Sequence, residues 1–227
     1  MTTAQTESGS GIDDDFLQRV GDKIAEHPVC KLIHKVSANY PLAEKIQSIR
    51  RRGKCPWYVF GGYVRDTIAG IEPNDLDTHV HPLCFWELIH QMQECDNVSL
   101  DMVYHPGDEI RNVYSHYNIQ ICIDDVKYKV DVVCTFTLEC DYTCNNLLYD
   151  PFTGEIRARH FPKLPAINTS RQFTRCDESI SRKDLIYRII GDIFAKRLCR
   201  VADIEDENRF RIRLYHMKRK GYSFPPK

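Results

Sequence analysis

The stretch over residues 60–77, FGGYVRDTIAGIEPNDLD, limits the fold of this chain more than any other. The apolar run just before the glycines, at 57–60, has the composition of a short buried strand. The glycine pair breaks that strand, a helical turn or two is expected over 64–70, and a second strand over 75–81. This succession predicts a mixed α and β unit with the glycine turn inside it.

Two aspartates lie at the start of the second expected strand. Alternate strand residues share a face, so Asp75 and Asp77 lie on one side, followed by His79 and His81. Carboxylates so placed are about 7 Å apart along the strand and repel each other unless a cation lies between them. Mg²⁺ fits the pair, and two such ions stabilise the attacking and leaving oxygens of an in-line displacement. The pattern predicts a metal site, and the two histidines are interpreted as a strand end that leaves it.

The glycine turn adds a second chemical element. Without side chains at Gly61 and Gly62, backbone N–H groups can approach a phosphate closely, and the N-terminus of the following helix adds a favourable dipole. The turn is not the dinucleotide fingerprint, because GGYVRD lacks the pattern G-x-G-x-x-G. A phosphate cradle followed closely by a metal site indicates phosphoryl or nucleotidyl transfer.

Asp131 is the candidate third carboxylate. The runs 119–123 and 128–132 predict a hairpin, and Asp131 lies on its second strand. It would complete the metal site or act as base on the attacking hydroxyl. The alternative is an ordinary solvated strand face, since Lys127 and Lys129 share that face.

The segment GGYVRDTIAGIEPNDLD resembles the signature of the tRNA nucleotidyltransferase (CCA-adding) and bacterial poly(A) polymerase family, in the polymerase-beta-like nucleotidyltransferase superfamily. The resemblance implies a head domain with a small mixed sheet, Mg²⁺ on Asp75 and Asp77, and a nucleoside triphosphate at the glycine turn. It also implies that Arg65 and Asp66 belong to the nucleotide site, with Arg65 holding phosphate or the turn itself. The matching positions are Gly61, Gly62, Val64, Arg65, Asp66, Asp75 and Asp77.

Two further segments resemble motifs of the same family. The run 140–150, CDYTCNNLLYD, is similar to R-R-D-F-T-x-N-A-L-x-Y-D, which implies that Asp141 and Asn145 contact the ribose and phosphates. The two arginines of that motif are replaced by Glu139 and Cys140, which removes two positive charges from a phosphate site.

The third motif is E-D-x-x-R, which in the family reads the edge of the base. The run 183–188, KDLIYR, offers Asp184 and Arg188 without the glutamate, and with the arginine displaced by one residue. The alternative for this Asp–Arg pair is simple support of a helix.

The order of elements predicts an α+β protein, a polymerase-beta-like head flanked by helices. We expect a disordered lead-in over 1–15, N-terminal helices over 16–54, the nucleotidyltransferase head over 55–156, and a helical, neck-like segment with a basic tail over 157–227. Helices are expected over 16–27, 42–52, 83–95, 139–150 and 182–202, with a final one of about ten residues from near 205, and a loop over 105–117.

The amino-acid composition limits the classes of partner and the cellular compartment that we expect for this protein. With 31 basic and 32 acidic residues there is no global field that favours nucleic acid. The sequence offers no apolar run of about 18 residues for a membrane helix. Ten cysteines without a secretory segment are expected to be reduced, in a cytoplasmic or nuclear setting, and buried rather than zinc-bound.

From Arg209 onward the sequence has seven basic residues and no acidic one. This stretch predicts either an RNA contact, with Tyr215 and Tyr222 stacking on bases, or a solvated helix face and an unstructured end.

These patterns predict an Mg²⁺-dependent nucleotidyltransferase that adds NMP from an NTP (ATP, CTP or both) to a hydroxyl, best matched by a tRNA-type RNA 3′ end, and releases pyrophosphate. Two alternatives stay open: a non-catalytic RNA- or nucleotide-binding protein, and a transferase that modifies a protein or small molecule. The resemblance covers roughly 55–200, and the family's long helical regions that grip tRNA are expected to lie beyond it. The chain would then hold RNA with less surface, use a protein partner, or act on something else.

Overall fold

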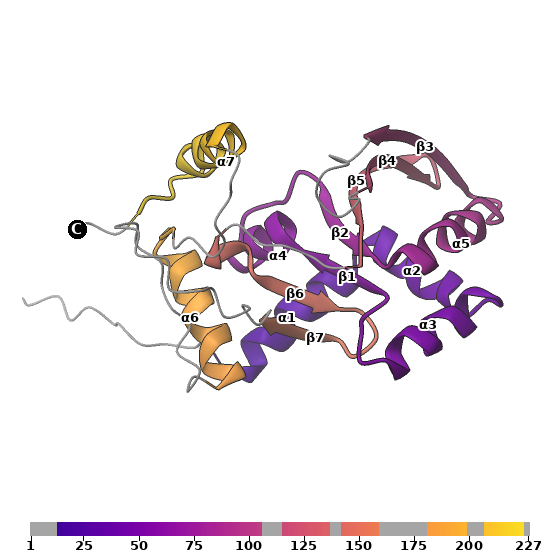
Figure 1. Cartoon of the computed structure of the whole chain (residues 1–227), viewed down its shortest axis with the longest axis horizontal. Coiled ribbons are helices and arrows are strands. Elements are labelled where there is room, and N and C mark those ends of the chain that lie inside the picture. The colour runs from indigo at the N-terminus through magenta and orange to yellow at the C-terminus, as the bar shows by residue number, and fades with distance from the viewer. Residues whose placement is uncertain (1–12, 106–114, 137–141, 159–180, 199–206, 225–227) are drawn as a thin grey trace, which may run out of the picture.

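The computed structural model describes residues 13–105, 115–136, 142–158, 181–198 and 207–224 (Figure 1). Its centre is a seven-stranded mixed sheet in the order β3-β4-β5-β2-β1-β6-β7. The strands are β1 (Trp57–Phe60), β2 (Leu76–Val80), β3 (Val98–His105), β4 (Ser115–Ile123), β5 (Val126–Cys134), β6 (Leu147–Asp150) and β7 (Glu155–Ala158). Only β2 and β5 pair in parallel; the other neighbours are antiparallel.

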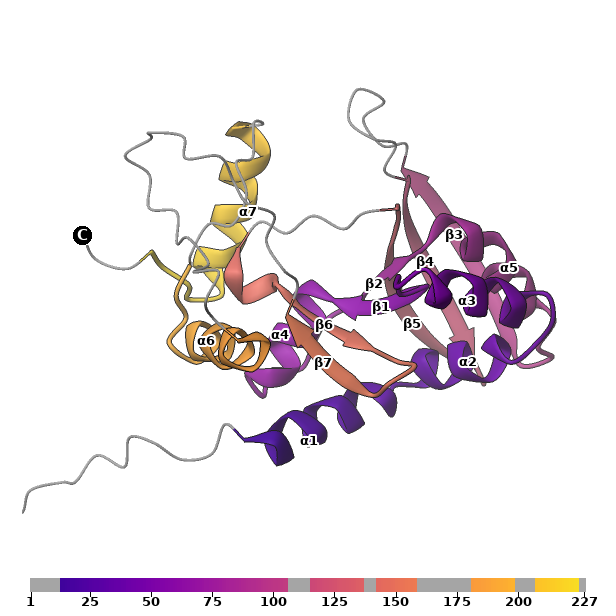
Figure 2. The same cartoon turned by 60° about the horizontal axis from the view of Figure 1, so that its bottom comes forward.

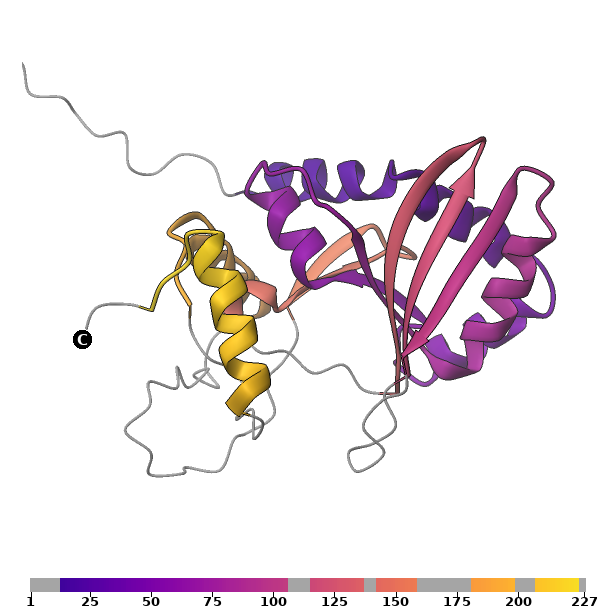
Figure 3. The ribbon, with the colours of Figure 1, turned by 90° about the horizontal axis from the view of Figure 1, so that it is seen from above.

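Seven α-helices surround the sheet within the described residues. They are α1 (Asp14–Ala25), α2 (Pro28–Ser37), α3 (Leu42–Arg51), α4 (Gly61–Ile68), α5 (Pro82–Gln93), α6 (Arg182–Phe194) and α7 (Glu207–Arg219). Helices α2, α3 and α5 lie near the β3–β5 end, whereas α6 and α7 lie beyond the other end (Figures 2 and 3). None of the described helices is both long and apolar enough to cross a membrane.

One face of the sheet is buried under α2 and α5. Alternate apolar residues of β4 and β5 point into this core, and α5 covers them with Phe85, Leu88 and Met92. On β2, Leu76, Thr78 and Val80 are buried. Because successive strand residues point to opposite faces, Asp77 and Asp131 belong to the other face. The hydrophobic pattern thus sets which side of the sheet carries the carboxylates.

The expected helix over 139–150 is wrong. Residues 137–141 lie outside the described part, a three-residue 3₁₀ turn η1 (Thr143–Asn145) follows, and β6 begins at Leu147. All four residues of β6 are buried, and the strand pairs with both β1 and β7. A short apolar run does not distinguish strand from helix locally, and here pairing on both sides decides it.

Other element boundaries also differ from the prediction. Helix α1 begins at Asp14, two residues before the expected start at 16, and Asp13 caps it by accepting a hydrogen bond from the Phe16 amide. Helix α2 was not predicted, and β4 begins at Ser115, inside the expected loop over 105–117. Helix α6 ends at Phe194 rather than near 202; two residues later Lys196 adopts a φ of 49°, in the left-handed region.

Candidate active site

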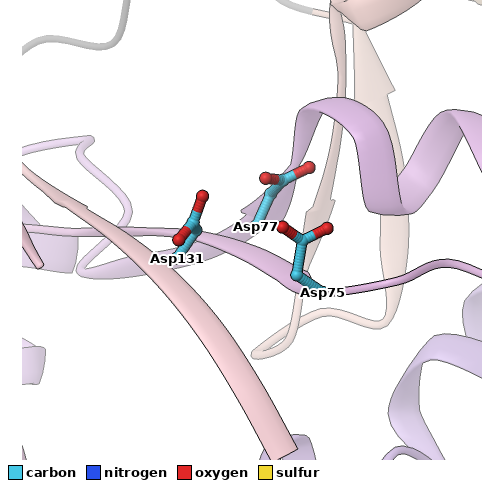
Figure 4. A group of neighbouring side chains, drawn as sticks. All are labelled: Asp75, Asp77 and Asp131. Carbon is cyan, nitrogen blue, oxygen red and sulfur yellow. The ribbon is translucent and has the colours of Figure 1, made fainter. Parts of the chain in front are cut away.

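Three carboxylates converge on the face of the sheet opposite the one that α2 and α5 cover. Asp77 lies on β2 opposite Asp131 of the parallel strand β5, and Asp75 immediately precedes β2. Each side chain offers a carboxylate oxygen within 4.8 Å of the others, and Figure 4 shows the three side chains on the same side of the strands. Among the described residues this is the only group of three or more acidic, histidine or cysteine side chains so gathered. The parallel register explains why a residue more than fifty positions away joins the pair.

The cluster carries strong charge repulsion. Burial, followed by the charge of Asp75, raises the pKa of Asp77 to about 6, although the Tyr63 amide opposes the shift. Burial and the charge of Asp131 raise the pKa of Asp75 as well. Within the described part of the chain, neither Asp75 nor Asp77 makes an ion pair with lysine or arginine. Hard carboxylate oxygens in this state fit a divalent cation such as Mg²⁺, which would relieve the repulsion.

The glycine turn begins α4 and touches Asp77 directly. The Tyr63 amide donates a hydrogen bond of 3.0 Å to Asp77 Oδ2. Gly61 has a φ of +64°, which favours glycine, and a Cβ added at Gly62 would lie 2.8 Å from the same carboxylate oxygen. The turn therefore holds a carboxylate in place by a bare helix N-terminus.

The Arg65 side chain forms hydrogen bonds with other residues of the protein interior. It is buried, with 3% of its surface exposed, and its Nε and Nη2 donate to Asp66 at 2.8 and 3.0 Å. Its Nη1 donates to Asn145 Oδ1 at 2.7 Å. Of the two implied roles, holding phosphate or holding the turn, these contacts match the second. They also bring the first and second family-like motifs together.

The other predicted site residues are placed differently. Asp141 lies outside the described residues. Asp184 sits in the first turn of α6, where its amide and carboxylate both bond the Ser181 hydroxyl. Arg188 is exposed on the same helix, and no hydrogen bond or ion pair links it to Asp184 in the described structure. The contacts around Asp184 are those of a helix cap.

The histidines after the carboxylates leave the site, as the sequence indicated. The His79 ring bonds the Thr135 carbonyl at 2.8 Å, and His81 caps α5 by accepting from the Leu83 amide. A different histidine was missed: His116 Nε2 lies 3.8 Å from Asp131 Oδ1. It faces Asp131 because β4 starts earlier than expected, and extending the alternating pattern backward over 115–118 would have found it.

The C-terminal segment also reaches the site, which local patterns did not predict. Lys220 Nζ lies 2.7 Å from Asp66 Oδ2, and the Tyr222 ring lies under the Arg65 guanidinium, with 5.7 Å from Arg65 Cζ to the ring centre. Tyr222 is only 3% exposed, so the expectation that it stacks on bases is wrong. Tyr215, at 61% exposed, remains on the surface. An isolated β-bridge joins Arg197, which follows α6, to Ser223, which follows α7.

Comparison with known proteins places the fold. No protein-family model and no curated protein matches the sequence. Among solved structures, a Thermotoga maritima CCA-adding enzyme complexed with tRNA aligns with a TM-score of 0.53 at 13% identity, over 93% of this chain and 42% of that one. A CCA-adding enzyme in complex with CTP aligns equally well, with a TM-score of 0.53 at 14% identity, over 92% of this chain and 43% of that one.

The chain thus spans less than half the length of the enzymes it matches. At such identities the likeness concerns the fold, and it agrees with the mixed-sheet head that the sequence motifs predicted. The described part of the chain shares the mixed-sheet fold of the aligned parts of these two CCA-adding enzymes.

Proposed function

We propose that this protein is an Mg²⁺-dependent nucleotidyltransferase that transfers NMP from an NTP to the 3′-hydroxyl of a tRNA-type RNA. The observation that carries the proposal is the gathering of Asp75, Asp77 and Asp131 beside the glycine turn of α4. Neighbouring carboxylates whose pKa values are raised by burial and by like charge, as those of Asp75 and Asp77 are, are typical of functional rather than purely structural groups.

The three aspartates have different roles in the proposed reaction. Asp75, Asp77 and Asp131 would hold Mg²⁺, which when bound would supply stabilisation of the charge that develops on the transferred phosphoryl group. The acceptor oxygen forms a bond to the α-phosphorus, the bond to the β-phosphate breaks, and pyrophosphate leaves. Asp131, whose side chain is 36% exposed, is the carboxylate best placed to take the hydroxyl proton.

The surrounding groups orient these parts. The N-terminus of α4 directs its dipole toward the Asp77 carboxylate, and the same dipole would favour the phosphates of a nucleotide bound beside it. Asn145, fixed by Arg65, is assigned to the ribose together with Asp141, and Asp184 and Arg188 remain candidates for the base. The acceptor and the nucleotide are proposed on the support of the matched CCA-adding enzymes, one complexed with tRNA and one with CTP.

The test is a transfer assay on the purified chain. Each labelled NTP is supplied in turn with Mg²⁺ and a tRNA that lacks its 3′ end. We expect lengthening of the RNA, abolished by EDTA. Loss of metal ligands in Asp75→Ala/Asp77→Ala should cost more than the roughly 10- to 100-fold that removing a supporting residue costs. Asp101→Ala is the matched control, because Asp101 is an exposed carboxylate on the edge strand β3.

The outcomes separate the alternatives. Unchanged transfer by the double variant would contradict the proposal. Binding of the tRNA without lengthening would favour the non-catalytic reading. If the RNA is neither bound nor lengthened while labelled nucleotide appears on a protein or small molecule, the acceptor assignment is wrong and the transferase assignment stands.

A further inference from the structure

Residues 217–222 pack against Arg65 and Asp66 of α4, across more than 150 positions of sequence. Met217 Sδ accepts from Arg65 Nη1 at 3.5 Å, Lys220 pairs with Asp66 at 2.7 Å, and Tyr222 lies against the Arg65 guanidinium. Met217 and Tyr222 are buried. Residues 217–222 therefore border the candidate active site through their contacts with α4.

The contact brings one surplus positive charge. Arg65 and Asp66 form a buried pair whose charges cancel, and Lys220 adds one more. Burial would raise the pKa of Asp66, but its bonds to Arg65 and Lys220 outweigh burial and hold that pKa below its usual value. Asp66 thus stays ionised at neutral pH, and the trio carries a net charge of about +1.

Lys220 has the means to bind a second anion. An ammonium group carries three N–H donors. Within the described structure Lys220 Nζ makes one hydrogen bond, to Asp66, and 40% of the side chain is exposed. The flexible stem of lysine presents the ammonium group as a compact charge to solvent or to a ligand.

The trio lies next to the carboxylates. A Cβ placed on Gly62 would stand 2.8 Å from Asp77 Oδ2 and 3.4 Å from Arg65 Nη2, so both groups approach this one glycine. The charge of Lys220 also acts on Asp75, where it opposes the rise in pKa. A cation whose contacts with the described residues leave N–H donors unused, placed beside the candidate metal site, matches the chemistry of a polyphosphate.

We propose that Lys220, supplied by the C-terminal segment, is a binding residue for the polyphosphate of the substrate nucleotide. The inference rests on the proposed function and goes beyond it, by assigning part of the phosphate site to a residue outside the glycine and carboxylate motifs. The competing role is purely structural: Lys220 would then only form the ion pair with Asp66 and would not contact the nucleotide.

The test measures binding of Mg²⁺-tripolyphosphate to the whole chain by calorimetry, with the melting temperature recorded for every variant. Lys220→Gln keeps an amide donor for Asp66 but removes the charge, Lys220→Met removes both, and Lys220→Arg keeps the charge. Lys218→Met is the matched control, since Lys218 is exposed in the last turn of α7, two residues before Lys220.

We expect Lys220→Gln and Lys220→Met to bind tripolyphosphate about tenfold more weakly, the size expected for one charge-assisted hydrogen bond. Lys220→Arg and Lys218→Met should bind as the parent does. Binding by Lys220→Gln within twofold of the parent would overturn the inference, even if Lys220→Met fails to fold.

The two proposals fail separately. Lys220-dependent binding of tripolyphosphate by a protein that transfers no nucleotide would sustain this inference and contradict the proposed function. Transfer to RNA with unchanged tripolyphosphate binding in Lys220→Gln would do the reverse.

Discussion

At the scale of single residues, Asp77 is the most constrained member of the carboxylate cluster. It accepts the Tyr63 amide, lies beside Gly62 and feels the charge of Asp75. The folded protein holds its proton more tightly than an unfolded chain, because its pKa is about 6 instead of 3.8. Without a divalent cation, stability therefore falls as the pH rises from about 4 to about 6, and the deficit persists at higher pH.

Asp77→Asn should accordingly stabilise the metal-free protein at pH 8. The gap between the two pKa values corresponds to at most roughly 3 kcal/mol. Asparagine keeps an oxygen for the Tyr63 amide and removes the repulsion. We expect the free energy of unfolding in EDTA to rise by about 1–3 kcal/mol at pH 8 and to change little at pH 4.

Denaturant titrations at the two pH values check this, with Asp101→Asn as the control. Mg²⁺ should raise the melting temperature of the parent and not of Asp77→Asn. A gain in stability of the same size at both pH values would show that charge repulsion is not its cause.

At the scale of elements, α4 is the part that joins strand, carboxylate and C-terminal segment. It has eight residues, nearly all buried, and starts directly after β1 with the glycine pair. The helix N-terminus is kept against Asp77 because β1 and β2 pair side by side. A side chain at the second glycine would separate the two.

Gly62→Ala should therefore reduce transfer by about ten- to a hundredfold, since the added Cβ displaces the Asp77 carboxylate. Its Mg²⁺-dependent gain in melting temperature should shrink as well. Gly191→Ala is the matched control: Gly191 lies inside α6 with no atom within 4 Å of an added Cβ, so it should gain about 0.5–1 kcal/mol and keep full activity. Equal activity of the two variants would contradict the close packing of α4 on Asp77.

At the scale of the whole molecule, the C-terminal segment is built into the head. Tyr222 is buried, and its ring lies against the Arg65 guanidinium. The Leu198 amide donates a hydrogen bond of 2.8 Å to the Ser223 carbonyl, which connects the residues after α6 to the residues after α7. Head and tail are therefore expected to unfold together.

Tyr222→Ala should cost about 3 kcal/mol in a single unfolding transition, because a buried aromatic ring is lost. Tyr215→Ala, at an exposed ring of α7, should stay within about 0.5 kcal/mol. Chemical denaturation monitored by fluorescence and circular dichroism checks both. Separate transitions for head and tail, with only the tail affected by Tyr222→Ala, would contradict this view.

Much of the candidate site follows from the sequence alone. Strand alternation places Asp75 and Asp77 on one side, and the glycine pair requires a bare turn before a helix. The hairpin that carries Asp131 was also recognisable from its two alternating runs. These inferences succeed because they depend on local periodicity and on backbone conformations that few residues adopt.

The tertiary structure decided the rest. The 147–150 run became a strand because β1 and β7 flank it, although its composition also suits a helix. Asp131 meets Asp77 through the parallel register of β5 with β2, and Arg65 turns inward because Asn145, Met217 and Tyr222 surround it. Lys220 reaches Asp66 across 154 positions. Such partners are chosen by packing between distant segments, and no local pattern in the sequence carries that information.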